Sequence, residues 1–310
     1  MKKMIITGLL LLIFLSSRTY GELTEMEIDQ ARAIYRENQL KTVSEALRRA
    51  DSMDAWPSGM DSISQFMTNE TSDSRHFRWG VCSEVYSCAM DIEGVTEKKK
   101  ELVWLLTTRL NDRSSTISGA VLSWLSDFNA ASFNESAKQN VKALFDAKMS
   151  RNTILLMGIV DQEYCLSKTS PLIEQADLFG HATGRFWGKA VWAALLVHAK
   201  AGDSRSVDIV LNALKHEPSE SFRVKKLFRD LGYTLHPKAV EYLKAQVIAD
   251  KTVPGGRDYS ALSYAQEACL VLSTMLENFP ERAGRLYTRS EIDHCKAWLL
   301  KQTEWRMVQH

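Results

Sequence analysis

The sequence predicts an all-α fold, a right-handed αα-superhelix in which antiparallel helix pairs stack as a solenoid. No segment alternates apolar and polar residues as a half-buried strand does, and nearly every segment after Glu22 has apolar residues three and four positions apart. The 310 residues include 15 glycines and only 6 prolines, few for an all-β chain with its many turns. Short connectors, of about two to six residues, make consecutive helices antiparallel neighbours.

The first element, residues 1–21, reads as a secretory signal peptide. Lys2 and Lys3 precede an apolar run from Met4 to Leu15, and small residues at Thr19 and Gly21 mark a cleavage site before Glu22. The alternative is a retained membrane anchor, but the run is shorter than the roughly 20 residues that a spanning helix needs. We therefore expect a secreted or periplasmic protein with no stable membrane insertion after cleavage.

Apolar spacing predicts the following elements, all helical. In chain order the predicted helices cover residues 24–37, 40–51, 61–68, 74–91, 96–111, 114–129, 134–149, 152–166, 169–178, 186–200, 205–216, 220–232, 237–250, 259–278, 280–287 and 290–307.

Prolines at three predicted helix starts indicate a repeat. Proline is tolerated at the first helical position because the amide it lacks has no partner there. Pro171 and Pro237 are 66 residues apart, twice 33, and Asp203 lies near the midpoint as a candidate N-cap. Pro280 follows Pro237 by 43 residues, and the excess of ten matches a predicted loop insertion at 252–261.

This register aligns apolar residues in three successive units between residues 186 and 287. At fixed offsets from the helix starts, the aligned sets are Val207, Val240 and Ala283; Val210, Leu243 and Leu286; Ala194, Leu227 and Leu270; and Leu195, Phe228 and Val271. A period in the thirties that contains two helices is typical of a helical solenoid.

The segment Ala201–Leu214 resembles the HEAT repeat, in particular its short bacterial variety. The matching residues are Gly202, Asp203, Arg205, Val207, Ala213 and Leu214. Leu235–Val240 is a weaker copy, and the segment near Pro280 keeps only the apolar skeleton. Tetratricopeptide repeats are the nearest alternative, but their Trp and Gly-Tyr landmarks do not recur at 34 residues. The resemblance, clearest at 186–287, implies an interaction module.

The repeat divides the chain into three parts. After the signal peptide at 1–21, residues 22–180 form a helical region of irregular helix pairs, which either continues the array or is a separate bundle. Residues 181–310 contain the HEAT-like helical repeats and a C-terminal capping helix.

Composition limits the partners. The chain is 45% hydrophobic and 25% charged, as ordinary globular proteins are, which excludes a disordered chain, a collagen and a polytopic membrane protein. Lys and Arg total 39 against 38 Asp and Glu. Such a balance argues against nucleic acid held by phosphate neutralisation.

The glycine-rich stretch at 180–188 is the candidate ligand site. His181 and Arg185 would approach an anionic ligand there, with Trp187 as a flat wall. The alternative is a helix junction in which Phe186 and Trp187 begin the next core helix.

Other chemistry is not indicated by the sequence. No two histidines stand three to five residues apart, and no phosphate-binding loop, nucleophile elbow or dinucleotide motif occurs. We therefore predict no metal, cofactor or catalytic residue. The five cysteines are expected to be buried thiols that pack as small hydrophobic side chains; the alternative is that Cys269 and Cys295, which lie on neighbouring predicted helices, pair.

We therefore expect a secreted or periplasmic, non-catalytic HEAT-like scaffold that binds a protein partner along its inner helices. The alternative is an all-helical enzyme with a polar cleft, possibly one that acts on glycans.

Overall fold

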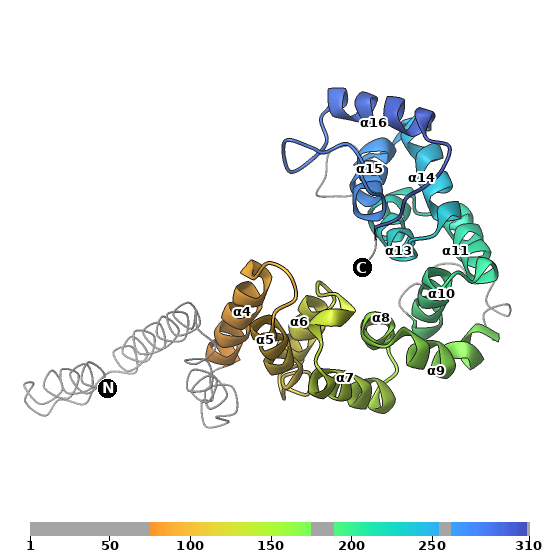
Figure 1. Cartoon of the computed structure of the whole chain (residues 1–310). Coiled ribbons are helices and arrows are strands. Elements are labelled where there is room, and N and C mark those ends of the chain that lie inside the picture. Colours follow the sequence, from red (N-terminus) through yellow and green to blue (C-terminus); the bar gives the residue numbers. More distant parts are fainter. Residues whose placement is uncertain (1–74, 175–188, 254–261, 309–310) are drawn as a thin grey trace, which may run out of the picture. The chain divides into compact units, whose positions relative to one another are not determined.

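The computed structural model describes residues 75–174, 189–253 and 262–308 (Figure 1). The predicted signal peptide and the predicted helices at 24–37, 40–51 and 61–68 lie outside these residues. The chain divides into two units, Met1–Glu84 and Val85–His310, and most of the described helices belong to the second. The predicted division at residue 181 stays a prediction.

The described chain is helical, as predicted. The helices are α4 (Arg75–Asp91), α5 (Glu97–Thr107), α6 (Ser115–Leu125), η1 (Ala130–Ser132), α7 (Glu135–Ala147), α8 (Arg151–Val160), α9 (Gln162–Glu174), α10 (Ala190–Lys200), α11 (Ser204–His216), α12 (Glu220–Phe222), η3 (Arg223–Leu227), α13 (Phe228–Tyr233), α14 (Pro237–Ala249), α15 (Tyr264–Met275) and α16 (Arg289–Lys301). The elements α12, η3 and α13 follow one another without a break and form one helix with a π turn at η3.

Strand pairing in the described chain is confined to short segments. Strands β1 (Thr252–Val253) and β2 (Leu262–Ser263) pair antiparallel, the first at the beginning of the predicted insertion at 252–261 and the second just after it. An isolated bridge joins Leu276 to Met307. Among the described helices, none is both long enough and apolar enough to cross a membrane.

Helix packing follows chain order. With 220–233 counted as one helix, each extensive helix–helix contact in the second unit joins a helix to the next or next but one along the chain. The contacts between alternate helices form an unbroken row from α6 through α8, α10 and α13 to α15, which we call the α6–α15 row (Figure 1). Neighbour-only packing of this kind is that of a solenoid-like fold, in which each helix pair is covered by the pairs before and after it.

The turn between α10 and α11 has the predicted local structure. Gly202 has a φ of 96°, which a glycine adopts without strain, and it ends the first helix. The Asp203 carboxylate accepts the backbone amides of Arg205 and Ser206 and caps α11. At the next turn, Pro237 occupies the first turn of α14 and the His236 ring accepts the Lys238 amide at 3.1 Å.

Two of the three proline predictions are wrong. Pro171 lies inside α9, where the hydroxyls of Thr169 and Ser170 donate to the carbonyls four residues earlier at 2.7 and 2.8 Å. The predicted helix at 152–166 is divided between α8 and α9 at Asp161. Asp161 is the extended C-cap of α8, and its carboxylate accepts the amide of Tyr164 in the first turn of α9.

Pro280 begins no helix, and the predicted helix at 280–287 is absent. Residues 277–288 form an irregular segment in which the buried Phe279 and Tyr287 pack edge to face, and Tyr287 donates to the Pro280 carbonyl at 2.9 Å. Ala283 and Leu286 are therefore exposed, so two of the aligned apolar sets fail in the third unit. Leu227 and Leu243 are wholly buried, as the register requires.

One buried carboxylate joins three helices of the α6–α15 row. Asp230 of α13, only 5% exposed, accepts Arg151 of α8 at 2.6 Å and the indole N–H of Trp192 of α10 at 2.8 Å. Trp192 is wholly buried. Because both oxygens are used by different helices, this carboxylate fixes how α8, α10 and α13 meet.

We expect Asp230→Asn to destabilise the fold strongly. The substitution keeps the size of the side chain but removes the charge that faces Arg151, and breaking a buried ion pair costs about 3–5 kcal/mol. Asp208→Asn is the matched control, because Asp208 pairs with Lys238 at the surface, where a pair contributes less than about 1 kcal/mol. Urea unfolding followed by circular dichroism measures both, and equal losses of stability would contradict the assigned role of Asp230.

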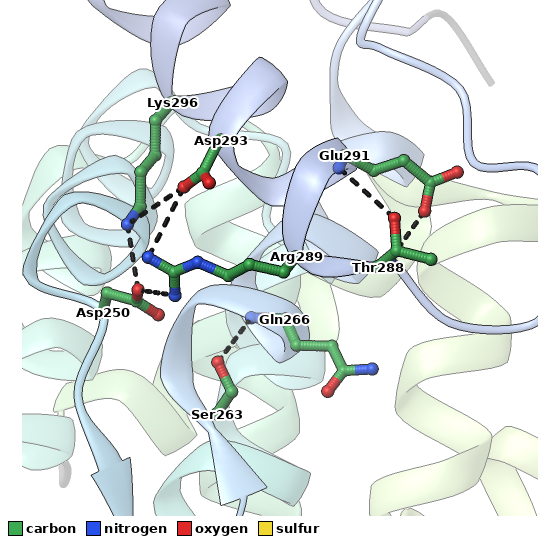
Figure 2. A network of polar contacts seen from close by, with 8 residues as sticks. All are labelled: Asp250, Ser263, Gln266, Thr288, Arg289, Glu291, Asp293 and Lys296. Atoms are coloured by element: carbon green, nitrogen blue, oxygen red, sulfur yellow. Dashed lines mark hydrogen bonds and ion pairs between the residues drawn. The ribbon is translucent and has the colours of Figure 1, made fainter.

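A second polar network holds the last helix (Figure 2). Asp250 ends α14 in the left-handed conformation, and its carboxylate contacts Arg289 and Lys296 of α16, the latter at 3.0 Å. A capping box between Thr288 and Glu291 begins α16. Burial acts to raise the pKa of Asp250, but the bonds from Lys296 and Arg289 prevail and hold the pKa below its ordinary value.

We expect the stability that Asp250 contributes to depend on pH. Because its pKa is lower in the folded state than the ordinary value of about 3.9, the contribution is present above that value and disappears as pH falls through the folded pKa. Asp250→Asn, which tolerates the same backbone conformation, should lower stability at pH 7 by roughly 1–2 kcal/mol. Thermal melts from pH 7 to 2.5 should show the two proteins converging, and a constant gap would disprove this account.

Candidate functional site

The α6–α15 row encloses a cavity of about 770 Å³, within the size range of ligand-binding clefts. The C-terminal ends of α8, α10 and α13 come together at this cavity. The cavity is lined by the segment after α6, the last turns of α8, α10 and α13, and one face of α15, with Met90 and Lys99 also contributing. The site therefore consists of helix ends that are far apart in sequence.

Two glycines in this lining permit the helices to meet closely. A Cβ on Gly158 of α8 would lie 2.7 Å from Val197 of α10 and 2.9 Å from the hydroxyl of Tyr233. A Cβ on Gly232 of α13 would lie 2.5 Å from a methyl group of Val271 of α15. Both distances are too short for a carbon contact, so the spacing of the row at the cavity depends on glycine.

Lys200 is the most distinctive charged group of the cavity. It is the last residue of α10, and its ammonium lies over the ring of Tyr233, 5.1 Å from the centroid. Burial lowers the pKa of this ammonium. Within the described residues no carboxylate lies at ion-pair distance from it, and its contacts are the aromatic ring and the partial negative charge of a helix end.

Other charges line the same cavity. Arg229 is an exposed cation without an ion pair among the described carboxylates, and Glu267 likewise has no ion pair to a described cation. Lys99 donates to the carbonyl of Ile92 at 3.0 Å. The cavity thus combines cations with helix ends, which attract groups that donate hydrogen bonds.

Tyr233 of the cavity lining, and Tyr86, which contacts the lining residue Asp127, are each held by a hydrogen bond. The Tyr233 hydroxyl donates to the Leu155 carbonyl at 2.9 Å, and burial raises its pKa. Tyr86, stacked on Trp124 at 5.1 Å, donates to the cavity residue Asp127 at 2.8 Å. Burial and this hydrogen bond raise the pKa of Tyr86 to about 12. Neither hydroxyl titrates near neutral pH, so both position the lining and do not exchange protons there.

The hydroxyls in the lining are bound within their own segments. Ser126 donates to the carbonyl of Leu122 at 3.2 Å, and Thr274 donates to that of Val271 at 2.7 Å. Ser132 donates to the side chain of Asn129 at 2.9 Å. An activated nucleophile requires a hydroxyl directed at a base. This arrangement is therefore suited to binding.

The predicted ligand residues His181, Arg185 and Trp187 lie outside the described residues, so their role stays a prediction. The structure adds Lys200, Arg229 and Tyr233, which sequence reasoning missed. Their only local signal is their position near a helix end, and no spacing in the sequence joins them. No group of three or more potential metal ligands occurs within the described part of the chain.

Comparisons with models of known protein families, with curated proteins and with solved structures found no match. The resemblance to HEAT repeats therefore rests on the sequence alone, clearest in the segment 201–214, and stays a prediction.

We expect alanine at either contact glycine to destabilise the row. Gly158→Ala and Gly232→Ala each force a buried neighbour to move, and overpacking of this kind costs about 1–3 kcal/mol. Gly119→Ala in α6 is the control, because nothing lies within 4 Å of its added Cβ, and alanine should gain about 0.5–1 kcal/mol there. Denaturant unfolding measures the change in the free energy of unfolding, which should fall for Gly158→Ala and Gly232→Ala and rise for Gly119→Ala. A more stable Gly232→Ala would refute the close contact.

Proposed function

We propose that this chain is an exported, non-catalytic scaffold that binds a protein partner, and that the cavity of the α6–α15 row receives an extended segment of that partner with an acidic side chain. The observation that carries the proposal is the Lys200 ammonium, which lies partly buried at the cavity with no described carboxylate at ion-pair distance. The resemblance to HEAT repeats supports it, because such repeats usually form interaction modules. Export rests on the signal-like segment at 1–21.

A carboxylate is the group best suited to pair with the Lys200 ammonium. Partial burial removes water from the ammonium, and an incoming carboxylate restores the lost interaction. The guanidinium of Arg229 lines the same cavity and offers a second, bidentate contact. Tyr233 provides a rigid wall beside the pair, and rigid aromatic side chains commonly anchor protein interfaces.

A peptide fits the remaining lining better than a phosphate does. The ends of α8, α10 and α13 carry partial negative charge, and the carboxyl side chains of Asp127 and Glu267 also line the cavity; together these groups disfavour a multivalent anion. Backbone amides of a peptide donate hydrogen bonds that such groups accept, while a single acidic side chain reaches Lys200. A volume of about 770 Å³ holds a few residues of a partner, so the remaining contacts lie along neighbouring helices.

The enzyme alternative has less support from the site. Glycan hydrolysis normally uses two carboxyl groups placed on either side of the bond that breaks. Here the carboxylate of Asp127 accepts the Tyr86 hydroxyl and is already engaged within the chain. Turnover of a polysaccharide by the purified protein would favour the enzyme over the scaffold.

We expect Lys200→Gln to weaken peptide binding at least tenfold, the equivalent of about 1.4 kcal/mol. The probe is a displayed library of random peptides selected on the full chain, and the enriched sequences should contain Asp or Glu. Affinities of the best peptide for the wild type and the variant are then measured by fluorescence anisotropy.

The control for this experiment is Lys301→Gln, an exposed lysine on α16 outside the cavity lining, which should leave binding unchanged. Affinity should also fall with added salt, because the pair is only partly buried. Selected peptides without acidic residues, or equal affinities for the wild type and Lys200→Gln, would refute the proposed role of the cavity.

A further inference from the structure

Two cysteines face each other between the last two helices. Cys269 of α15 and Cys295 of α16 are both wholly buried and belong to one hydrophobic core. The helices that carry them pack against each other. The two side chains lie close enough that each shifts the pKa of the other.

The other three cysteines are placed differently. Cys165 of α9 is buried and directs its thiol at the carbonyl of Ile154, 3.5 Å away. Cys82 and Cys88 lie on the single helix α4, and a separation of six residues along a helix is a rise of about 9 Å, too long for a disulfide. The pair at 269 and 295 is thus the one whose location on facing helices suits a covalent bond.

We propose that Cys269 and Cys295 form a disulfide that fastens α16 to α15 when the chain folds in the presence of a disulfide-bearing oxidant, such as oxidised glutathione. This inference is independent of the proposed binding function. It assigns a covalent bond to the C-terminal end of the helix stack, where α16 packs only on the helices that precede it.

The chemistry balances as a thiol–disulfide exchange. The thiolate of one cysteine attacks a sulfur of the oxidant, whose S–S bond breaks and releases one thiol. The second protein thiolate then attacks the mixed disulfide and releases the second thiol. The protein loses two protons and two electrons, and the oxidant takes them up as it becomes two thiols.

In the folded chain the Cys269 side chain lowers the pKa of Cys295, whereas the Cys295 side chain and burial raise the pKa of Cys269. Both sulfurs are covered in the folded chain, so the oxidant reaches them during folding, before α16 is packed.

The proposed bond would reinforce a segment that few regular contacts hold. It closes a loop that contains the irregular residues 277–288, which the Glu291 carboxylate anchors by accepting the amides of Ala283 and Thr288 at 2.7 and 2.6 Å. Closing a loop of this length restricts the unfolded chain. Together with the Asp250 network, the bond would keep the capping helix on the stack (Figure 2).

Thiol counting on the full chain tests the proposal. Protein refolded with reduced and oxidised glutathione is denatured and alkylated with iodoacetamide, with or without prior reduction. We expect three alkylated cysteines without reduction and five after it. Trypsin should release the peptide covering 258–282 linked to that covering 290–296. Five alkylated cysteines without reduction, or a link between any other pair, would overturn the proposal.

A melting experiment tests the expected consequence. Reduction should lower the Tm of the oxidised wild type by about 5–10 °C, given the length of the closed loop. The Tm of Cys295→Ala should not respond to reductant, and Cys165→Ala should respond as the wild type does. If the Tm of the wild type does not change on reduction, the bond does not hold α16, irrespective of the Tm values of the variants.

Discussion

The carboxylate of Asp230 is the interaction on which the arrangement of the helices most depends. A buried charge is tolerated only when other groups replace its water, and here the groups come from α8 and α10 while the carboxylate comes from α13. Three successive helices of the row must therefore keep one mutual position. Tyr233 lies one turn beyond Asp230, so the same constraint places the ring that faces Lys200.

Packing between near neighbours explains why the cavity gathers residues that are far apart in sequence. Each helix of the row contacts the next helix of the row, and the C-terminal ends of α8, α10 and α13 meet at the cavity. Phe128, Lys200, Tyr233 and Thr274 reach one cavity although about 150 residues separate the first from the last. Glycine at 158 and 232 sets how closely these ends approach.

The sequence predicted the fold class and the turns whose determinants are local. Gly202, Asp203 and the His236–Pro237 pair act within a few residues of themselves, so their roles could be read directly. The helix starts predicted at Pro171 and Pro280 were wrong, because a proline begins a helix only where the surrounding packing also favours a helix start. Phe279 and Tyr287 reach the core from an irregular segment, a pairing that helical periodicity does not reveal. In the sequence Lys200 cannot be distinguished from any other lysine at a helix end, because the Tyr233 ring that it contacts lies on another helix.

Arg151 and Lys200 illustrate two uses of a partly buried cation in one fold. Arg151 meets a carboxylate inside the chain, so its charge contributes to stability. Lys200 meets a ring and a helix end, which compensate for lost water less completely than a carboxylate does. A neutral side chain at position 200 would satisfy the fold at least as well. Under the proposed function, the charge there pairs with a carboxylate of the partner, and this contrast is the physical basis of that proposal.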